Sequence, residues 1–167
     1  MKFSRLLLGT VQFGLNYGIA NTQGKPSFER VKAILKTALD NGITSLDTAA
    51  AYGDSEEVLG KALAELGIAD RMTIVSKVPP LPAGCDPLEF ITNSVSTSLK
   101  RLRLPVIPLI LFHNELDWRC NEELSSLIDK GMIQGAGVSL DSLECAATAD
   151  ESPYVQLPCN VFDHRFG

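Results

Sequence analysis

Short apolar runs alternate along the whole chain with segments in which apolar residues recur at helical spacing. The runs predict six buried strands, at Leu6–Val11, Gly42–Asp47, Met72–Lys77, Val106–His113, Gly135–Leu140 and Tyr154–Asn160. Most of these runs are apolar at successive positions rather than at every second one. Such strands are typical of a parallel sheet that is covered on both faces.

The segments between the runs predict helices with recognisable starts. They begin at Ser27, Ser55, Asp86, Asn121 and Ser142, and the first four end near Asp40, Leu66, Leu102 and Ile128. We expect Ser55 to cap its helix, with acidic residues in the first turn. At the third helix, Asp86 is expected as the cap and Pro87 as the first helical residue.

A repeated strand–helix unit fits two architectures, a doubly wound open sheet and a (β/α)8 barrel. The first strand–helix turn lacks the G-x-G-x-x-G pattern of dinucleotide-binding open sheets. In a barrel, reactive residues lie at the carboxyl ends of several strands. Asp47, Lys77 and His113 occupy such positions. The prediction is therefore one truncated domain over residues 1–167, a partial (β/α)8 TIM barrel of about six parallel strands.

Composition narrows the class of protein. Apolar residues make up 45% of the chain and charged ones 21%, which is typical of a globular protein. The net charge of −5 argues against a nucleic-acid partner. No apolar run is long enough to cross a bilayer, and the leucines before Gly9 are too few for a signal peptide. The four cysteines are widely spaced, which indicates thiols in a reducing compartment. We therefore expect a cytoplasmic protein without a metal or a membrane partner.

An acid, a phenol, an ammonium and an imidazole follow three successive strands, as Asp47, Tyr52, Lys77 and His113. A phenol ordinarily has a pKa near 10. A nearby lysine would lower that value and make Tyr52 a better proton donor. Taken singly, each residue also has a plain structural interpretation, as a turn residue, a packed aromatic, a solvated lysine or a core histidine.

In their local contexts, LDTAAAYG, VSKV and LFHN, the four residues resemble the catalytic tetrad of the aldo-keto reductase family. The resemblance extends from Leu8 to Asn160. It implies that Asp47, Tyr52, Lys77 and His113 are catalytic and that the substrate is a small carbonyl compound, an aldehyde, a ketone or a sugar.

The resemblance also implies a nicotinamide cofactor, expected to be NADPH. Ser139 and Gln156 would hold its carboxamide, and Gly9 and Thr10 would lie against it. Where many members have Ser-Asn after strand five, this chain has Ser139 followed by Leu140. The last two strand–helix units of the family, whose loops bind the cofactor's phosphates, do not follow. The chain is thus expected to be either a fragment or a natural short form.

The implied chemistry is hydride transfer to a carbonyl carbon with proton delivery to its oxygen. Tyr52 would donate the proton, and Lys77 would lower its pKa. Asp47 would pair with Lys77 and hold it, while His113 would orient the substrate oxygen.

Two other functions stay open. One is a metal-dependent hydrolase that uses Asp47, His113 and either Asp163 or His164, although the chain has only two histidines. The other is a non-catalytic barrel fragment that binds a nucleotide weakly or self-associates as a homo-oligomer. Its first and sixth strands would have open edges, and open edges favour pairing with a second copy.

Overall fold

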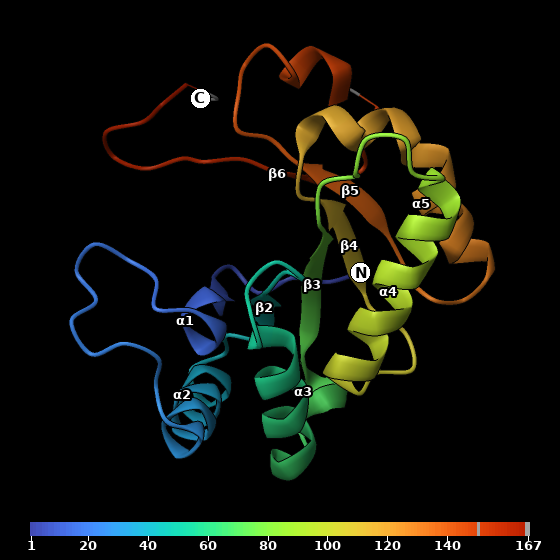
Figure 1. The fold of residues 1–167 in the computed structure, drawn as a ribbon. Coiled ribbons are helices and arrows are strands. Elements are labelled where there is room, and N and C mark those ends of the chain that lie inside the picture. Colours follow the sequence, from blue (N-terminus) through green and yellow to red (C-terminus); the bar gives the residue numbers. More distant parts are fainter. Residues whose placement is uncertain (150, 166–167) are drawn as a thin grey trace.

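The computed structural model describes residues 1–149 and 151–165, and its central feature is a parallel sheet (Figure 1). The six strands are β1 (Leu7–Gly9), β2 (Ser45–Asp47), β3 (Thr73–Val78), β4 (Leu109–Phe112), β5 (Ala136–Ser139) and β6 (Val155–Gln156). They lie side by side in chain order, and each pairs in parallel with the next. The sheet curls into a partial (β/α)8 barrel, as predicted.

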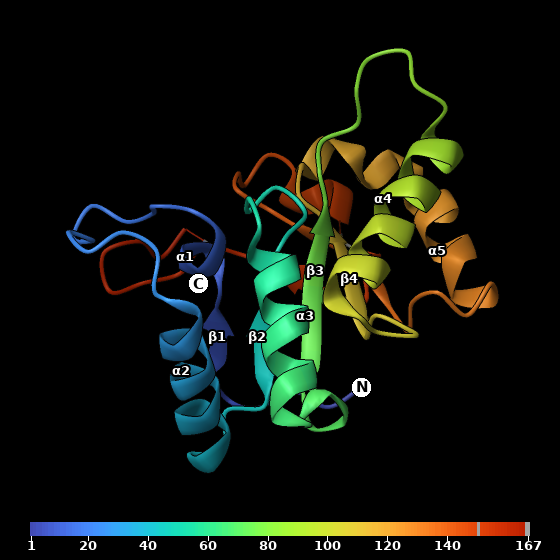
Figure 2. The same cartoon turned by 60° about the horizontal axis from the view of Figure 1, so that its bottom comes forward.

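The longer helices lie together on the outer face of this sheet (Figures 1 and 2). The α-helices are α1 (Val11–Gly14), α2 (Phe28–Asp40), α3 (Ser55–Leu66), α4 (Pro87–Leu102) and α5 (Asn121–Asp129). Three short 3-10 helices complete the described elements: η1 (Ala69–Arg71), η2 (Glu115–Cys120) and η3 (Ala146–Ala149). None of the helices in the described part of the chain is long and apolar enough to cross a membrane.

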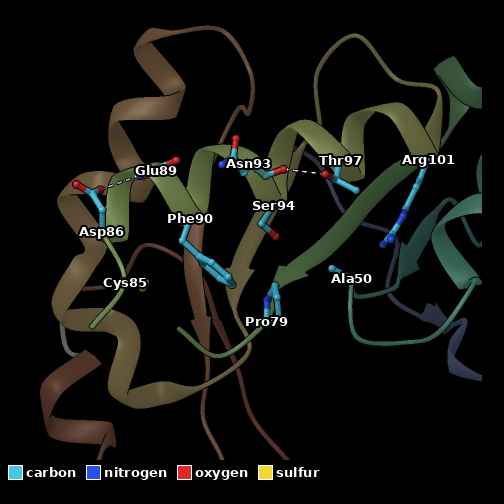
Figure 3. Close-up of a pocket in the computed structure, with 10 residues that line it drawn as sticks. All are labelled: Ala50, Pro79, Cys85, Asp86, Glu89, Phe90, Asn93, Ser94, Thr97 and Arg101. Carbon is cyan, nitrogen blue, oxygen red and sulfur yellow. Dashed lines mark hydrogen bonds between the residues drawn. The ribbon is translucent and has the colours of Figure 1, made fainter. Parts of the chain in front are cut away.

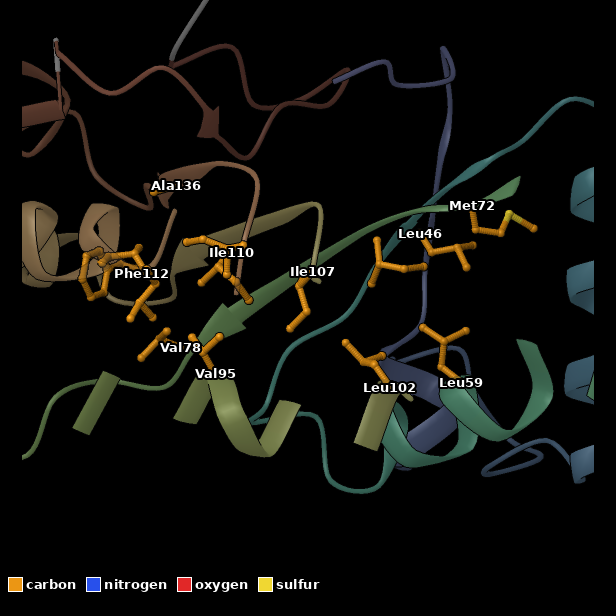
Figure 4. Close-up of a cluster of buried hydrophobic side chains, with 14 of the residues drawn as sticks. Leu46, Leu59, Met72, Val78, Val95, Leu102, Ile107, Ile110, Phe112 and Ala136 are labelled. Carbon is orange, nitrogen blue, oxygen red and sulfur yellow. The ribbon is translucent and has the colours of Figure 1, made fainter. Parts of the chain in front are cut away.

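The main hydrophobic core fills the space between the sheet and the helices (Figure 4). Its strand residues include Leu46, Ile110 and Phe112, and its helix residues include Val95 and Leu102, all at most 1% exposed. The apolar residues of α3 and α4 recur at helical spacing because one stripe of each helix faces the strands across this core.

The inner face of the sheet is much less covered. A second, small cluster of Val75, Leu109 and Leu111 is buried there, with Phe3 and Tyr154 packed against it. A cavity of about 550 Å³ adjoins this cluster. The expectation of cover on both faces is thus met on the outer side, whereas the inner side is an open concave surface.

Several predicted boundaries move, each for a local reason. Asp86 caps α4 as expected, because its carboxylate accepts from the Glu89 backbone N–H at 2.9 Å. Ser55 is not a cap: Asp54 precedes α3 as the N-cap residue, and Ser55 is the first helical residue. The first and sixth strands are shorter than predicted, since α1 begins at Val11 and β6 ends at Gln156. The predicted helix from Ser142 is only the short η3.

Candidate functional site

The carboxyl ends of the strands bring Asp47 and Lys77 together. Successive strand residues face opposite sides of a sheet. Lys77 therefore shares the inner face with Val75, the register partner of Asp47. The Lys77 Nζ donates to Asp47 Oδ1 at 2.6 Å and to the Thr48 carbonyl oxygen at 3.0 Å. Lys77 is only 2% exposed. The predicted ion pair is confirmed, and Lys77 is not a solvated lysine.

Burial lowers the pKa of Lys77, and the Asp47 carboxylate opposes that effect. A buried ammonium needs a partner, because removing the charge from water is costly. Asp47 and the Thr48 carbonyl supply that partner. The ion pair and this carbonyl are therefore what keeps the charged form of Lys77 in the site.

Tyr52 lies over this pair on the turn between β2 and α3. The Lys77 Nζ is 5.2 Å from the centroid of its ring. The His113 ring stands edge-on to it, with centroids 5.6 Å apart and an interplanar angle of 84°. The sequence-predicted tetrad is thus one cluster, with Asp47, Tyr52, Lys77 and His113 on the loops and ends of β2, β3 and β4.

Two glycines allow the Tyr52 turn to pack so closely. Gly53 has a φ of +59°, and a Cβ there would lie 2.6 Å from the Gly14 carbonyl oxygen. A Cβ on Gly14 would lie 1.8 Å from the Tyr52 carbonyl oxygen. Since real Cβ atoms do not approach backbone so closely, α1 can lie against the turn only with glycine at both positions.

The expected lowering of the pKa of Tyr52 is wrong for this arrangement. Burial raises the pKa of Tyr52 to about 12, and the charges of Asp47, Tyr17 and Asp141 add to the rise. The Lys77 charge, which is paired with Asp47, does not outweigh burial and these negative charges. The pKa of His113 is lowered, first by burial and then by Lys77. The phenol is thus held protonated and the imidazole neutral.

The predicted cofactor contacts flank the tetrad. Ser139 and Gln156 are register partners on β5 and β6. Gln156 Nε2 donates to Asp47 Oδ1 at 3.1 Å, although the two residues lie 109 positions apart. Leu140 is 2% exposed and packs into the main core. Its side chain therefore cannot take the place of the Asn found in many family members.

Gly9 and Thr10, at the end of β1, differ in how accessible they are to a ligand. Gly9 is exposed, and nothing lies within 4 Å of where its Cβ would be. Thr10 is completely buried, and its hydroxyl donates to the Asp47 carbonyl oxygen at 2.9 Å. A ligand can approach Gly9, whereas the Thr10 side chain is already engaged within the protein.

Glu115, in η2 after β4, makes contacts that the sequence did not indicate. Its Oε2 accepts from the backbone N–H groups of Asp141 at 2.8 Å and Ser142 at 3.1 Å. Its Oε1 accepts from the Ser142 hydroxyl at 2.7 Å. Although burial opposes it, these hydrogen bonds lower the pKa of Glu115 to about 2. Glu115 thus ties the loop after β4 to the loop after β5. No local pattern marks it, because its partners are 26 and 27 positions away.

The donor set of a metal centre does not assemble within residues 1–149 and 151–165. No group of three His, Cys, Asp or Glu side chains there lies close enough to hold an ion. Asp47 is occupied by Lys77 and Gln156, while Asp163 pairs with Arg165 at 2.8 Å. The geometry therefore does not favour the hydrolase hypothesis.

A separate cavity of about 610 Å³ lies on the flank of α4 (Figure 3). Phe90, Ser94 and Arg101 point from the helix toward Pro79 and Ala50, which follow β3 and β2 (Figure 3). None of the tetrad side chains lines it. The chemistry that the tetrad can support therefore lies on the inner side of the strand ends and not in this cavity.

Comparison with known proteins gives consistent results. A family model described as Aldo/keto reductase family matches residues 5–166. Aldo-keto reductase YhdN from Bacillus subtilis is 35% identical over 184 residues, which cover 99% of this chain and 53% of that protein. The crystal structure of the aldo-keto reductase PA4992 from Pseudomonas aeruginosa superposes with a TM-score of 0.82 at 34% identity, over 96% of this chain and 65% of that one.

A third similar protein was crystallised with a cofactor. An aldo/keto reductase from Klebsiella pneumoniae in complex with NADP and acetate is 28% identical with a TM-score of 0.69, over 87% of this chain and 49% of that one. The present chain spans about half the length of YhdN, since the match covers 53% of it.

Proposed function

Because this chain belongs to the aldo/keto reductase family, we propose that it carries the acid–base half of a carbonyl reductase site, with Tyr52 as the proton donor. The observation that supports this most is the cluster in which Lys77 Nζ contacts Asp47 at 2.6 Å and lies 5.2 Å from the Tyr52 ring centroid. In such a cluster the phenol can donate a proton to a carbonyl oxygen, the buried ammonium can stabilise the phenolate, and the neutral imidazole can orient the substrate.

The cofactor in this proposal is NADPH, which when bound supplies the hydride for the carbonyl carbon. The residues present suit its nicotinamide carboxamide. Ser139 and Gln156 are adjacent on neighbouring strands. The Ser139 hydroxyl makes no hydrogen bond with any of the described residues, and Gln156 uses only its Nε2 for Asp47. A hydroxyl and an amide oxygen are thus free to meet a carboxamide at this edge of the sheet.

In this proposal the protein's own side chains hold the proton and donate it to the substrate oxygen. The raised pKa of Tyr52, about 12, keeps the proton on the phenol until an oxyanion develops on the substrate. The buried ammonium of Lys77, paired with Asp47, then stabilises the phenolate that forms. His113, whose pKa is lowered by burial and by Lys77, is neutral and can orient the carbonyl oxygen.

The test is a titration with NADPH followed by nicotinamide fluorescence, together with turnover of a panel of aldehydes, ketones and sugars. In Tyr52→Phe, kcat is expected to fall about a hundredfold, the usual size of a general-acid contribution, while NADPH binding is kept. Tyr154→Phe is the matched control, because Tyr154 packs on Phe3 away from the tetrad. Activity that survives in Tyr52→Phe would remove Tyr52 as the acid.

A second candidate is self-association without catalysis, and the open inner face supports it. Within the described residues, β1 and β6 each pair with only one neighbouring strand. Leu7 and Val155 are 44% and 43% exposed beside the inner cavity. Light scattering after size-exclusion chromatography tests this candidate: a defined dimer that fails to bind NADPH supports it, and a monomer that binds NADPH contradicts it. The cytoplasmic location stays a prediction.

A further inference from the structure

Three buried hydroxyls meet directly behind the Asp47–Lys77 pair. Thr10, Thr48 and Ser55 are each 0% exposed. The Ser55 Oγ lies 3.0 Å from Thr10 Oγ1 and 3.1 Å from Thr48 Oγ1. They come from three separate segments: the end of β1, the end of β2 and the first residue of α3. Ser55 is the point at which these segments are joined through side chains.

The protons of this hydroxyl cluster can be assigned without conflict. Ser55 donates to the Thr10 carbonyl oxygen at 2.8 Å, and Thr48 donates to Ser55 Oγ at 3.1 Å. Thr10 donates to the Asp47 carbonyl oxygen at 2.9 Å. Each hydroxyl thus has one acceptor, as a buried polar group requires. Removing the Ser55 hydroxyl leaves Thr48 without its acceptor, and removing the Thr48 hydroxyl takes a donor away from Ser55.

The cluster fixes the position of Thr48, whose backbone carbonyl oxygen accepts a hydrogen bond from Lys77. The Thr48 backbone N–H donates to the Val75 carbonyl oxygen at 2.8 Å, while the Thr48 carbonyl oxygen accepts from Lys77 Nζ at 3.0 Å. The side chain of the same residue is held by Ser55. The carbonyl oxygen of the residue before it is held by Thr10. These hydroxyls therefore hold the backbone of Asp47 and Thr48, the two residues whose carboxylate and carbonyl oxygen accept from Lys77.

We propose that Ser55, acting through Thr48 and Thr10, is a positioning residue that holds the Asp47 carboxylate and the Thr48 carbonyl against the Lys77 ammonium. It touches none of the reacting atoms. The inference rests on the proposed reductase function only for its catalytic consequence. The structural consequence, the charge state of Lys77, can be measured without any cofactor or substrate.

Loosening the turn should change the pKa of Lys77 in one direction. Burial lowers the pKa of Lys77, and Asp47 opposes it. When the turn is loosened, the opposing contacts weaken while the burial stays. The pKa of Lys77 is therefore expected to fall further. A residue that merely anchored α3 would lower the stability of the fold without moving this pKa.

The experiment follows the ε-carbon shift of Lys77 against pH by NMR in protein labelled at lysine, assigned with Lys77→Arg. Thr48→Val removes a hydroxyl at nearly constant shape and should lower the pKa of Lys77, as should Ser55→Ala. Thr48→Ser restores the hydroxyl and should return the pKa to the wild-type value. Ser98→Ala is the matched control, since Ser98 is 2% exposed on α4 and outside the cluster. If Thr48→Val does not fold, the pKa of Lys77 in Ser55→Ala is compared with that in Ser98→Ala instead.

An unchanged pKa in Thr48→Val and Ser55→Ala overturns the proposal, and so does an equal fall in Ser98→Ala or in Thr48→Ser. Where the wild-type chain reduces a carbonyl compound, kcat in Thr48→Val should fall about tenfold with little change in KM, since a transition-state contact is loosened. Failure of the wild type to turn over any carbonyl would count against the reductase proposal. In that case the pH titration of Lys77 would still test whether Ser55 is a positioning residue.

Discussion

The two halves of the site are built differently. Around β2 and β3, Asp47 and Lys77 are held by buried polar contacts, and Lys77 and Ser55 are at most 2% exposed. Around β5 and β6, Ser139 and Gln156 are partly exposed, and β6 has only two residues. The half that must keep a buried charge in one geometry is rigidly supported. The half that would receive a ligand is held by few contacts.

The difference follows from the cost of burying charge. A buried ammonium must keep its partners, so the residues around Lys77 are fixed by a second layer of hydrogen bonds. A carboxamide contact is neutral and can form when the ligand arrives. The Gln156 amide, which donates to Asp47 in this structure, links the two halves. The following predictions compare matched substitutions across them.

The largest difference is expected for glycine-to-alanine changes. Gly14→Ala would place a Cβ 1.8 Å from the Tyr52 carbonyl oxygen and 2.4 Å from the Ser55 nitrogen, both backbone atoms in the rigid half. Gly137→Ala would approach the Tyr154 carbonyl oxygen at 2.2 Å, and we expect this backbone to shift more easily because the adjacent β6 has only two residues. We expect the free energy of unfolding to fall by about 3 kcal/mol in Gly14→Ala and by about 1 kcal/mol in Gly137→Ala.

Urea denaturation measures both changes. Gly9→Ala is the control, because nothing lies within 4 Å of its Cβ position, and its stability should change by less than about 0.5 kcal/mol. Equal losses in Gly14→Ala and Gly137→Ala would show that the two halves are equally rigid, contrary to this comparison.

A smaller difference is expected when a serine hydroxyl that donates a hydrogen bond is removed from each half. The Ser76 hydroxyl donates to the Glu56 carboxylate at 2.6 Å, and Glu56 is 1% exposed. Ser76→Ala leaves a buried carboxylate oxygen without this donor, at a cost of about 2 kcal/mol. The Ser152 hydroxyl donates to the Tyr154 carbonyl oxygen at 2.9 Å in a partly exposed position. Ser152→Ala should cost about 0.5 kcal/mol. The same denaturation assay checks both values, and a larger loss in Ser152→Ala would reverse the comparison.

The smallest expected effect is the pH dependence of stability that Glu115 contributes next to the β5–β6 half. The pKa of Glu115 is about 2, below its ordinary value of 4.5. Its contribution to stability is therefore present above pH 4.5 and is lost as the pH falls toward 2. Glu115→Gln should remove that part of the acid dependence, a difference of less than about 1 kcal/mol at neutral pH. Stability curves measured from pH 2 to 6 test this, and identical acid limbs in the two proteins would contradict it.

Much of the fold could be predicted from the sequence, because apolar runs and helical spacing report burial directly. The six strands occur in the predicted order, and Asp86 caps α4 as its local pattern indicates. The pairing of Asp47 with Lys77, which the family resemblance implied, is also confirmed. The roles of Ser139 and Gln156 stay predictions.

What could not be predicted depends on contacts between distant segments. Ser55 has the sequence context of a helix cap, yet its hydroxyl faces Thr10, 45 positions away. The pKa of Tyr52 was expected to fall beside Lys77. It rises to about 12, because burial and Asp47 outweigh a lysine whose charge is already paired.

The sequence by itself determined the strands and the residues at their carboxyl ends, because apolar runs report burial directly. Only the tertiary structure decided how those residues share their charges and hydrogen bonds. The physical reason is that periodicity is a property of neighbouring residues. A pKa or a buried hydrogen bond depends on whatever the fold brings within a few ångströms, as Gln156 and Asp47 illustrate.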